Sequence, residues 1–127
     1  MTTLGAVIAA VRPGEVEIVL PFSDKILQQH SFIHAGAVAT IADSACGYAA
    51  LSVMPRDAAV LTTEFKINLL APAKGERLRA IGRVVRGGKK LVITLGEVFA
   101  EEGGARKQVA LITATMMVVD TGTGLRD

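Results

Sequence analysis

His34 and Asp43 stand out as chemically active side chains in an otherwise small and mostly apolar stretch of this sequence. In residues 31–54 the only other groups that titrate are Cys46 and Tyr48, and most remaining side chains come from Ala, Gly, Val, Ile, Ser and Thr. A carboxylate can act as a general base or as a nucleophile. Asp43 is therefore the first candidate for a catalytic group.

The stretch around these two residues predicts one long helix. Residues 35–53 contain no proline, and their number is typical of a helix and too large for most strands. Two glycines inside a helix would each cost about 1 kcal/mol, so we expect them to serve close packing against a sheet. The nearly bare side of the helix that would serve this purpose contains Gly36, Ala39, Thr40, Asp43, Cys46, Gly47 and Ala50.

The rest of the chain has the pattern of strands. Residues 5–11 and 15–20 flank an Arg-Pro-Gly-Glu turn and predict a hairpin. Ser23 or Asp24 is expected to begin a short helical turn that ends near Gln29. After the long helix, turns rich in Gly or Pro separate four apolar runs, which we expect to form a meander. These four runs are residues 60–70, 76–86, 90–101 and 107–119.

Together these elements predict an α+β fold in which a curled antiparallel sheet wraps around one central helix. Residues 1–127 are expected to form a single domain, with residues 122–127 as a loose tail. The last strand is apolar or Thr on both faces, so we expect it to be central and covered on both sides, the outer side by another subunit. Half of all residues are hydrophobic, which also favours an apolar subunit interface.

The composition argues against several classes of partner and cofactor. A formal net charge of +2 is too small to indicate nucleic-acid binding. One cysteine, Cys46, excludes an intrachain disulfide and a cysteine-based zinc site. His30 and His34 are four residues apart but have no evident third ligand, so we expect no metal. No signal peptide is apparent, and an acid in the middle of residues 33–54 disfavours a membrane span, so we expect a cytoplasmic protein without membrane contacts.

Several groups of residues resemble a known family. His34-Ala35-Gly36, followed by Ile-Ala-Asp-Ser-Ala at residues 41–45, is similar to the HGG…LAD(T/S)A motif of hotdog-fold acyl-CoA thioesterases of the phenylacetate-pathway (PaaI-like) type. The strand of residues 62–72, which ends in proline, and the basic hairpin of residues 83–90 resemble later parts of the same family. The resemblance covers roughly residues 5–120. It implies a hotdog fold, and it implies no separate cofactor, because coenzyme A is part of the substrate.

The resemblance also implies roles for individual residues. Asp43 would act as the general base or nucleophile on the thioester. The backbone N–H groups of Ala35 and Gly36, at the start of the helix, would hold the thioester oxygen as it becomes negative. His34 would help to order the turn that carries these two donors.

Two positions depart from the family pattern, and the role of a third residue depends on strand register. Ala35 replaces the first glycine of the motif, which keeps the N–H group but adds a methyl group that crowds the approach of substrate. Gln28 stands where the family usually has Asn and is one methylene longer. Thr62, placed by alignment on Pro72, would orient the water or the acid, provided that the register does not place Thr63 there instead.

Residues 77–90 contain six basic residues and no acidic one. Two interpretations of this cluster stay open. In one, Arg86, Lys89 and Lys90 bind the phosphates of coenzyme A. In the other, the cluster is a solvated strand face. The residues that would point outward on that face are Arg77, Arg79 and Arg83.

The spacing of the candidate groups predicts the oligomeric state. Ala35 and Asp43 are eight residues apart, which is about 12 Å along a helix axis. A single thioester carbon cannot easily lie next to both. We therefore expect a homodimer, alone or as a dimer of dimers, in which each site combines the helix start of one chain with Asp43 of the other.

These observations favour an acyl-CoA thioesterase that converts an aryl- or medium-chain acyl-CoA to the free acid and CoA. A non-catalytic acyl-CoA sensor or regulator with the same fold is the main alternative. A hotdog enoyl-CoA hydratase or dehydratase is a weaker alternative, because it needs a His and an acid in one site and the spacing of His34 and Asp43 suits this poorly.

Overall fold

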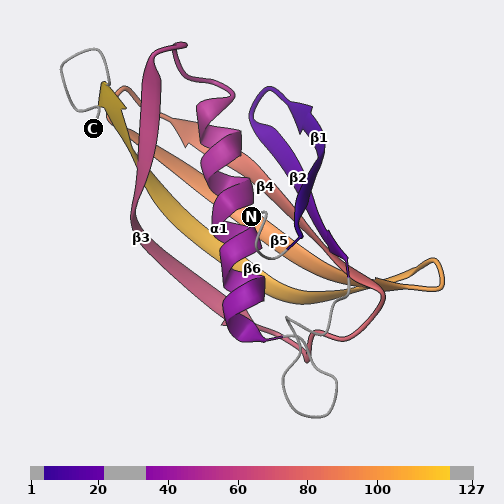
Figure 1. Ribbon diagram of the computed structural model, residues 1–127. Helices are drawn as coiled ribbons and strands as arrows, with labels where there is room; N and C mark the ends of the chain where they lie inside the picture. The colour runs from indigo at the N-terminus through magenta and orange to yellow at the C-terminus, as the bar shows by residue number, and fades with distance from the viewer. Residues whose placement is uncertain (1–4, 22–33, 121–127) are drawn as a thin grey trace.

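The computed structural model describes residues 5–21 and 34–120, and these form one six-stranded antiparallel sheet curled around one helix (Figure 1). The predicted fold class, a hotdog fold, is confirmed. The helical turn predicted near residues 23–29 and the tail of residues 122–127 lie outside the described residues. In chain order the elements are β1 (Val7–Arg12), β2 (Glu15–Pro21), α1 (Ala35–Leu51), β3 (Ala58–Leu69), β4 (Arg77–Gly87), β5 (Leu91–Glu102) and β6 (Ala105–Asp120).

The predicted meander of four strands is wrong for β3. The strand order is β1-β2-β4-β5-β6-β3, so that β4, β5 and β6 form a meander while β3 pairs with β6 at the far edge. Residues 70–76 connect β3 to β4, and this segment is longer than a tight hairpin loop. The edge of β4 that β3 would have used is occupied by β2. β3 is therefore an edge strand of the described sheet, with β6 as its neighbour, and it lies beside α1 (Figure 1).

Close packing between α1 and the sheet depends on small residues on both sides. A Cβ atom at Gly82 would lie 2.5 Å from the Ala45 carbonyl carbon. A Cβ atom at Gly96 would lie 3.0 Å from Cys46 Sγ. The residues of α1 that are buried against the sheet are Ala37, Val38, Ile41, Ala42, Ala45, Cys46, Ala49 and Ala50.

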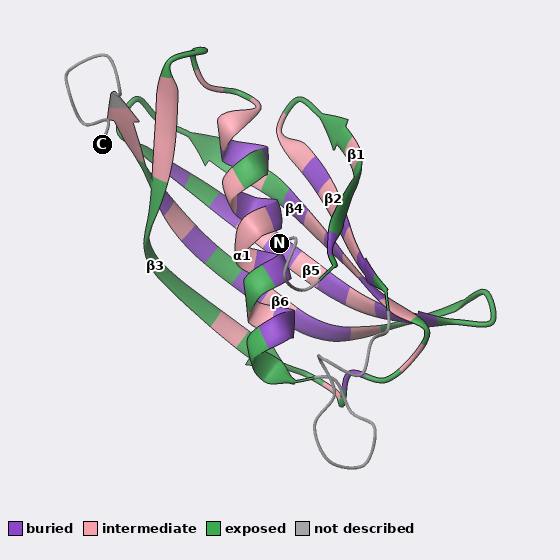
Figure 2. Cartoon of the chain, viewed as in Figure 1, coloured by how far each residue is buried: buried purple, intermediate pink, exposed green. Residues whose placement is uncertain are grey.

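The prediction of which side of α1 lies under the sheet is therefore only partly right. Cys46 and Ala50 are buried as predicted, but Gly36 and Thr40 are exposed and Asp43 is half-buried. The apolar side chains on the opposite side of the helix compete better for the sheet, because their burial removes more surface from water. The part of this side that carries Gly36, Thr40 and Asp43 is consequently open in a single chain. Figure 2 shows exposed and intermediate segments along α1.

Strand β6 is central, since it pairs with both β5 and β3. Its inner residues, such as Ile112 and Met116, are fully buried, whereas Thr113 and Met117 on the outer face are exposed. The expected cover on both faces is therefore absent within the described part of one chain, and cover by another subunit stays a prediction. Within residues 5–21 and 34–120, no helix has the length and apolar character to cross a membrane.

The outer face of the sheet carries a cluster of charges around Glu101. Arg77 and Arg79 donate to its two carboxylate oxygens over 2.8 and 2.9 Å, and Arg106 donates over 3.1 Å. These hydrogen bonds, chiefly that from Arg79, lower the pKa of Glu101 to about 2, although burial opposes the shift. Arg83 pairs with Glu97 at 3.2 Å. The predicted outward orientation of these arginines is confirmed, and they are paired with acids instead of standing free.

We expect Glu101→Gln to lower the free energy of unfolding at neutral pH by about 1.5–3 kcal/mol, because it removes hydrogen bonds to a charged group. The pKa of Glu101 is lower in the folded chain than its ordinary value of 4.5, so its stabilisation is complete above that pH and is lost as the pH falls towards 2. Urea unfolding as a function of pH measures both effects. Glu102→Gln, at an exposed neighbour, is the control and should change stability by less than about 0.5 kcal/mol.

Candidate active site

The start of α1 offers unpaired backbone donors. His34 is the N-cap residue, with φ −57° and ψ 138°, and its side chain makes no capping hydrogen bond. Its carbonyl oxygen accepts hydrogen bonds from the N–H groups of Ala37 and Val38. The N–H groups of Ala35 and Gly36 have no backbone partner within the described residues, and the first turn contains no acid. These two groups can therefore receive a negatively charged oxygen at the positive end of the helix dipole.

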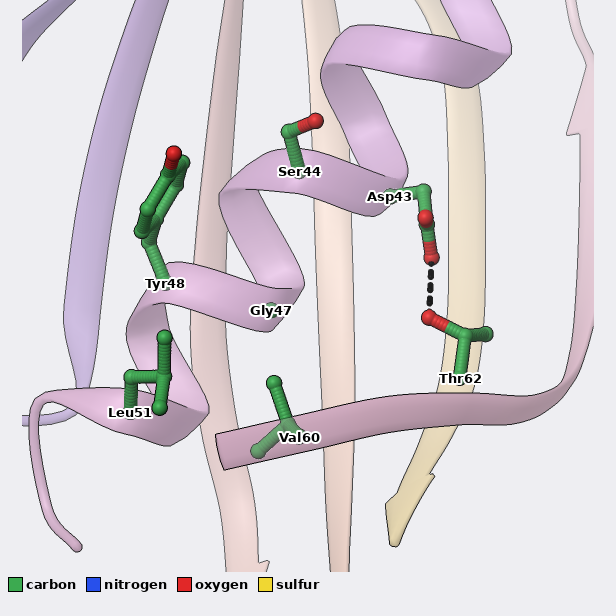
Figure 3. Close-up of a pocket in the computed structure, with 7 residues that line it drawn as sticks. All are labelled: Asp43, Ser44, Gly47, Tyr48, Leu51, Val60 and Thr62. Atoms are coloured by element: carbon green, nitrogen blue, oxygen red, sulfur yellow. Dashed lines mark hydrogen bonds between the residues drawn. The ribbon is translucent and has the colours of Figure 1, made fainter. Parts of the chain in front are cut away.

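Asp43 and Thr62 meet across the gap between α1 and β3. Thr62 Oγ1 donates a hydrogen bond to Asp43 Oδ1 over 2.8 Å (Figure 3). The carboxylate is half-buried and lies on the open side of the helix. Thr62 thus holds one carboxylate oxygen, which leaves the other free to face a water molecule or a substrate.

A β-bulge at Thr63 fixes which threonine faces the helix. The pairing of β3 with β6 shifts between Thr62 and Glu64, and Thr63 Oγ1 donates to the carbonyl of Thr115 over 3.1 Å. Thr62 is paired with the buried Met116 and so lies on the inner face, while Glu64 is paired with Thr115 on the outer face. A bulge of this kind re-aims side chains. The strand register therefore places Thr62, and not Thr63, towards Asp43, as the prediction for Thr62 required.

Asp43 and Thr62 line a small pocket of about 240 Å³ (Figure 3). Sequence reasoning missed most of its lining. Gly47 was placed on the same side of the helix as Asp43, but for packing against the sheet. Leu51, eight residues after Asp43, also lies on that side, and its spacing could have identified it. The remaining lining residues are Ser44, Tyr48 and Val60.

Within one chain the structure does not bring all candidate residues together. The pocket at Asp43 is not lined by His34, Ala35 or Gly36. The regular helix from Ala35 to Leu51 separates the helix start from Asp43 by about 12 Å. Gln28 lies outside the described residues.

The basic hairpin lies at the other end of the helix from Ala35. Arg86, Lys89 and Lys90 are exposed, and none of them lines the Asp43 pocket. Lys89 lines a second cavity of about 470 Å³, where the hairpin meets Val53 and Met54 just beyond the end of α1. Asp57 also lines this cavity, whereas Arg86 and Lys90 do not. Three exposed cations close together on one hairpin can attract an anionic group.

Cys46 is not suited to nucleophilic chemistry. Burial raises the pKa of its thiol to about 11, and the charge of Asp43 acts in the same direction, while a hydrogen bond with Thr94 opposes the shift. The thiol is therefore protonated near neutral pH, whereas a cysteine nucleophile needs the thiolate. Within the described ranges, no group of three or more His, Cys, Asp or Glu side chains is placed to hold a metal ion.

Comparison with known proteins places this geometry in a family. Residues 30–107 match the thioesterase superfamily. A thioesterase family protein from Silicibacter pomeroyi is 47% identical, with a TM-score of 0.92, and the match covers 94% of this chain and 88% of that one. The BH2602 protein from Bacillus halodurans, whose crystal structure contains CoA, is 28% identical, with a TM-score of 0.75, over 81% of this chain and 66% of that one.

A curated relative from Halobacterium salinarum, named as an esterase, is 31% identical over 93 residues. The match covers 69% of this chain and spans 61% of the length of that relative. The resemblance seen in the motif around Asp43 is therefore confirmed by matches that extend over most of the chain.

Proposed function

The chain belongs to the thioesterase superfamily, and we propose that it hydrolyses the thioester of an aryl- or medium-chain acyl-CoA. The observation that carries this proposal is the hydrogen bond between Thr62 and Asp43, which presents an oriented carboxylate at a pocket. Thioester hydrolysis needs an activated water or a carboxylate nucleophile, together with donors for the oxyanion. The chain provides Asp43 for the first task and the N–H groups of Ala35 and Gly36 for the second.

In the proposed reaction, Asp43 takes a proton from water while the water oxygen bonds to the thioester carbon. The resulting oxyanion is held by the N–H groups of Ala35 and Gly36. The C–S bond then breaks, and Asp43 returns its proton to the leaving thiolate of CoA. In the alternative, Asp43 attacks the thioester carbon, the C–S bond breaks and CoA leaves as the thiolate. Water then hydrolyses the mixed anhydride on Asp43, which releases the acid, restores the carboxylate and supplies the proton that the thiolate takes up.

The open side of α1 supports a site shared between two chains. If Asp43 of each chain lies beside Ala35 of the other, the two-fold axis passes close to Ala39, midway between them. This part of the helix is suited to close contact with a second helix. Gly36 has no side chain, and Thr40 satisfies its hydroxyl by donating to the Gly36 carbonyl over 2.8 Å.

Strand β3 supplies apolar surface beside this helix face. Phe65 and Leu69 are 49% and 57% exposed, and their pairing with Ala114 and Ala110 puts them on the inner face of the sheet. Surface of this kind favours a protein interface. We propose that the small open side of α1 packs on the same element of a partner chain, where sequence analysis expected it to pack on the sheet.

Arg86, Lys89 and Lys90 are proposed to bind the phosphates of CoA. Unlike Arg77, Arg79 and Arg83, they have no ion pair with an acid in the part of the chain that the structure describes. They are therefore available to a phosphate group, for which Lys and Arg are the usual ligands. The CoA found in the Bacillus halodurans relative supports this ligand class.

The acyl or aryl group is proposed to occupy the pocket beside Gly47. Pockets that enclose whole drug-sized ligands measure about 300–1,000 Å³, so the 240 Å³ here suits the acyl end of the substrate alone. A Cβ atom at Gly47 would meet only Val60 Cγ2, at 4.0 Å. The absence of a side chain at Gly47 thus leaves the pocket open.

We expect Gly47→Leu to lower kcat/KM for phenylacetyl- or octanoyl-CoA about tenfold or more relative to acetyl-CoA, because the new side chain fills the pocket. The chain should not lose stability, since a glycine inside a helix costs about 1 kcal/mol. Gly47→Ala provides an intermediate step in side-chain volume. An unchanged ranking of acyl groups in both variants would show that the acyl group binds elsewhere.

A thiol-release assay across aryl-, medium- and short-chain acyl-CoA substrates tests the proposed function. Turnover of an aryl or medium-chain substrate is the expected result. Tight acyl-CoA binding without thiol release would favour the sensor. Hydration of crotonyl-CoA would favour the hydratase.

A further inference from the structure

The second cavity, of about 470 Å³, lies beyond the end of α1 and shares no lining residue with the Asp43 pocket. Its volume falls in the range of about 300–1,000 Å³ that is typical of small-molecule sites. Apolar side chains form most of its wall, together with one acid and one base. The lining residues come from the segment after α1, the start of β3, the β4–β5 hairpin and the end of β6. They are Val53, Met54, Pro55, Asp57, Ala58, Gly88, Lys89 and Val118.

Backbone hydrogen bonds hold two sides of this cavity in place. The Ala58 N–H group donates to the Pro55 carbonyl over 3.0 Å, which closes the turn between α1 and β3. The Val118 N–H group donates to the Lys90 carbonyl over 2.7 Å, which ties the hairpin to the end of β6. Met54 and Val118 also pack against the hydrophobic core. The cavity is therefore largely formed before a ligand binds, as is usual for small-molecule sites.

The charges around the cavity favour an anion at its rim and disfavour one in its interior. Asp57 lines the cavity, and the negative end of the α1 dipole lies next to it, because α1 ends at Leu51. Among the lining residues the cation is Lys89, while Arg86 and Lys90 lie on the same hairpin outside the cavity. Phosphates are therefore expected on the hairpin. The interior suits an uncharged group that has apolar faces and a hydrogen-bond donor.

We propose that this cavity binds the adenine base of CoA while the hairpin holds the phosphates. The inference rests on the proposed function and deepens it, because it adds a site for the base to the sites for the thioester, the acyl group and the phosphates. Adenine is uncharged near neutral pH, and its two faces are apolar enough to pack against Val53, Met54 and Val118. Its exocyclic amino group donates hydrogen bonds, which the carboxylate of Asp57 can accept.

The position of the cavity suits a ligand with two distant ends. Leu51 is eight residues after Asp43, about 12 Å along the helix axis, and the cavity begins just beyond it in the same chain. The pantetheine arm of CoA separates the thioester from the diphosphate, and in an extended form it is long enough to bridge this distance. A thioester on a carrier protein has the same arm but no adenine. Binding of the base therefore selects acyl-CoA over an acyl group on a carrier protein.

The first test measures binding without turnover. Adenosine 3′,5′-bisphosphate, which has the base of CoA but not the arm, is titrated calorimetrically into the wild-type chain, Ala58→Leu and Ala59→Leu. Ala58 lines the cavity and Ala59 does not, and both are half-buried. We expect Ala58→Leu to raise the dissociation constant about tenfold or more, because it fills the cavity, and Ala59→Leu to change it less than about twofold. No binding to the wild-type chain, or equal binding by the two variants, would overturn the inference.

Inorganic pyrophosphate, which has phosphates but no base, is the control ligand for this test. It should not discriminate between Ala58→Leu and Ala59→Leu, because the hairpin is intact in both. If Ala58→Leu weakened pyrophosphate binding as much as it weakened nucleotide binding, the cavity would hold phosphate and not adenine, which would contradict the inference.

The second test compares the acyl-CoA that is hydrolysed fastest with the N-acetylcysteamine thioester of the same acid, which lacks the nucleotide. We expect Ala58→Leu to raise KM for the acyl-CoA about tenfold at unchanged kcat and to leave kcat/KM for the short thioester unchanged. Ala59→Leu should alter neither substrate. An equal loss with both substrates, or no loss with either, would contradict the adenine site. If no thioester is hydrolysed while the binding test gives the expected result, the proposed hydrolysis fails and the adenine site stands.

Discussion

Replacement of Asp43 by asparagine is expected to lower kcat for acyl-CoA hydrolysis by about 10²- to 10⁴-fold, the typical contribution of a positioned general base. Asparagine has nearly the same shape and can still accept the hydrogen bond from Thr62, so the helix and the pocket should keep their geometry. What is lost is the ability to take a proton from water or to attack the thioester. Thiol release at saturating substrate measures the effect, and circular dichroism establishes that the variant is folded.

The control for this prediction is Glu64→Gln, which removes a carboxylate from the same strand as Thr62 but from its outer face. It should turn over substrate at close to the wild-type rate. If Asp43→Asn also kept most of its activity in highly purified protein, Asp43 could be neither base nor nucleophile. The proposed site would then have to be abandoned, although the fold would stand.

The second large effect is expected from Ala35→Pro. Proline is well tolerated at the first position of a helix, and it removes the backbone N–H group without removing a hydrogen bond of the helix. His34 already has ψ 138°, which suits a residue before proline. Loss of one oxyanion donor should lower kcat about 10²- to 10³-fold.

Ala35→Gly is the matched control, because it keeps the N–H group and removes only the methyl group. It also restores the glycine of the family motif, and it should be at least as active as the wild-type protein. An Ala35→Pro variant with wild-type kcat would show that this N–H group does not bind the oxyanion. Thermal unfolding of both variants separates an effect on chemistry from an effect on stability.

Local sequence patterns predicted much of the fold. The long helix was found because residues 35–51 contain no proline and are too numerous for a strand, and it ends two residues before the predicted residue 53. The strands were found from apolar runs bounded by Gly and Pro. The edge position of β3 was missed, because strand order is set by which neighbours β2 and β6 find across the sheet, and no local pattern records this.

The site was also predicted only in part, because some of its contacts depend on residues that are distant in sequence. Asp43 and Thr62 came from the motif and its alignment, and the structure brings them to 2.8 Å of each other. The bulge at Thr63 that makes this contact depends on pairing with Thr115, which is far away in sequence. Which side of α1 faces the sheet was also misjudged, because small residues suit a close approach to a sheet and to a second helix equally well.

We expect one site to combine the helix start of one chain with Asp43 of another. Co-expression of Asp43→Asn and Ala35→Pro chains with different affinity tags, followed by purification on both tags, isolates the mixed dimer. This dimer should contain one intact site and one site with both defects, so it should regain about half of the wild-type activity per dimer. Activity in the mixed dimer no higher than in the two parent variants would show that both groups act within one chain, and would contradict the shared site.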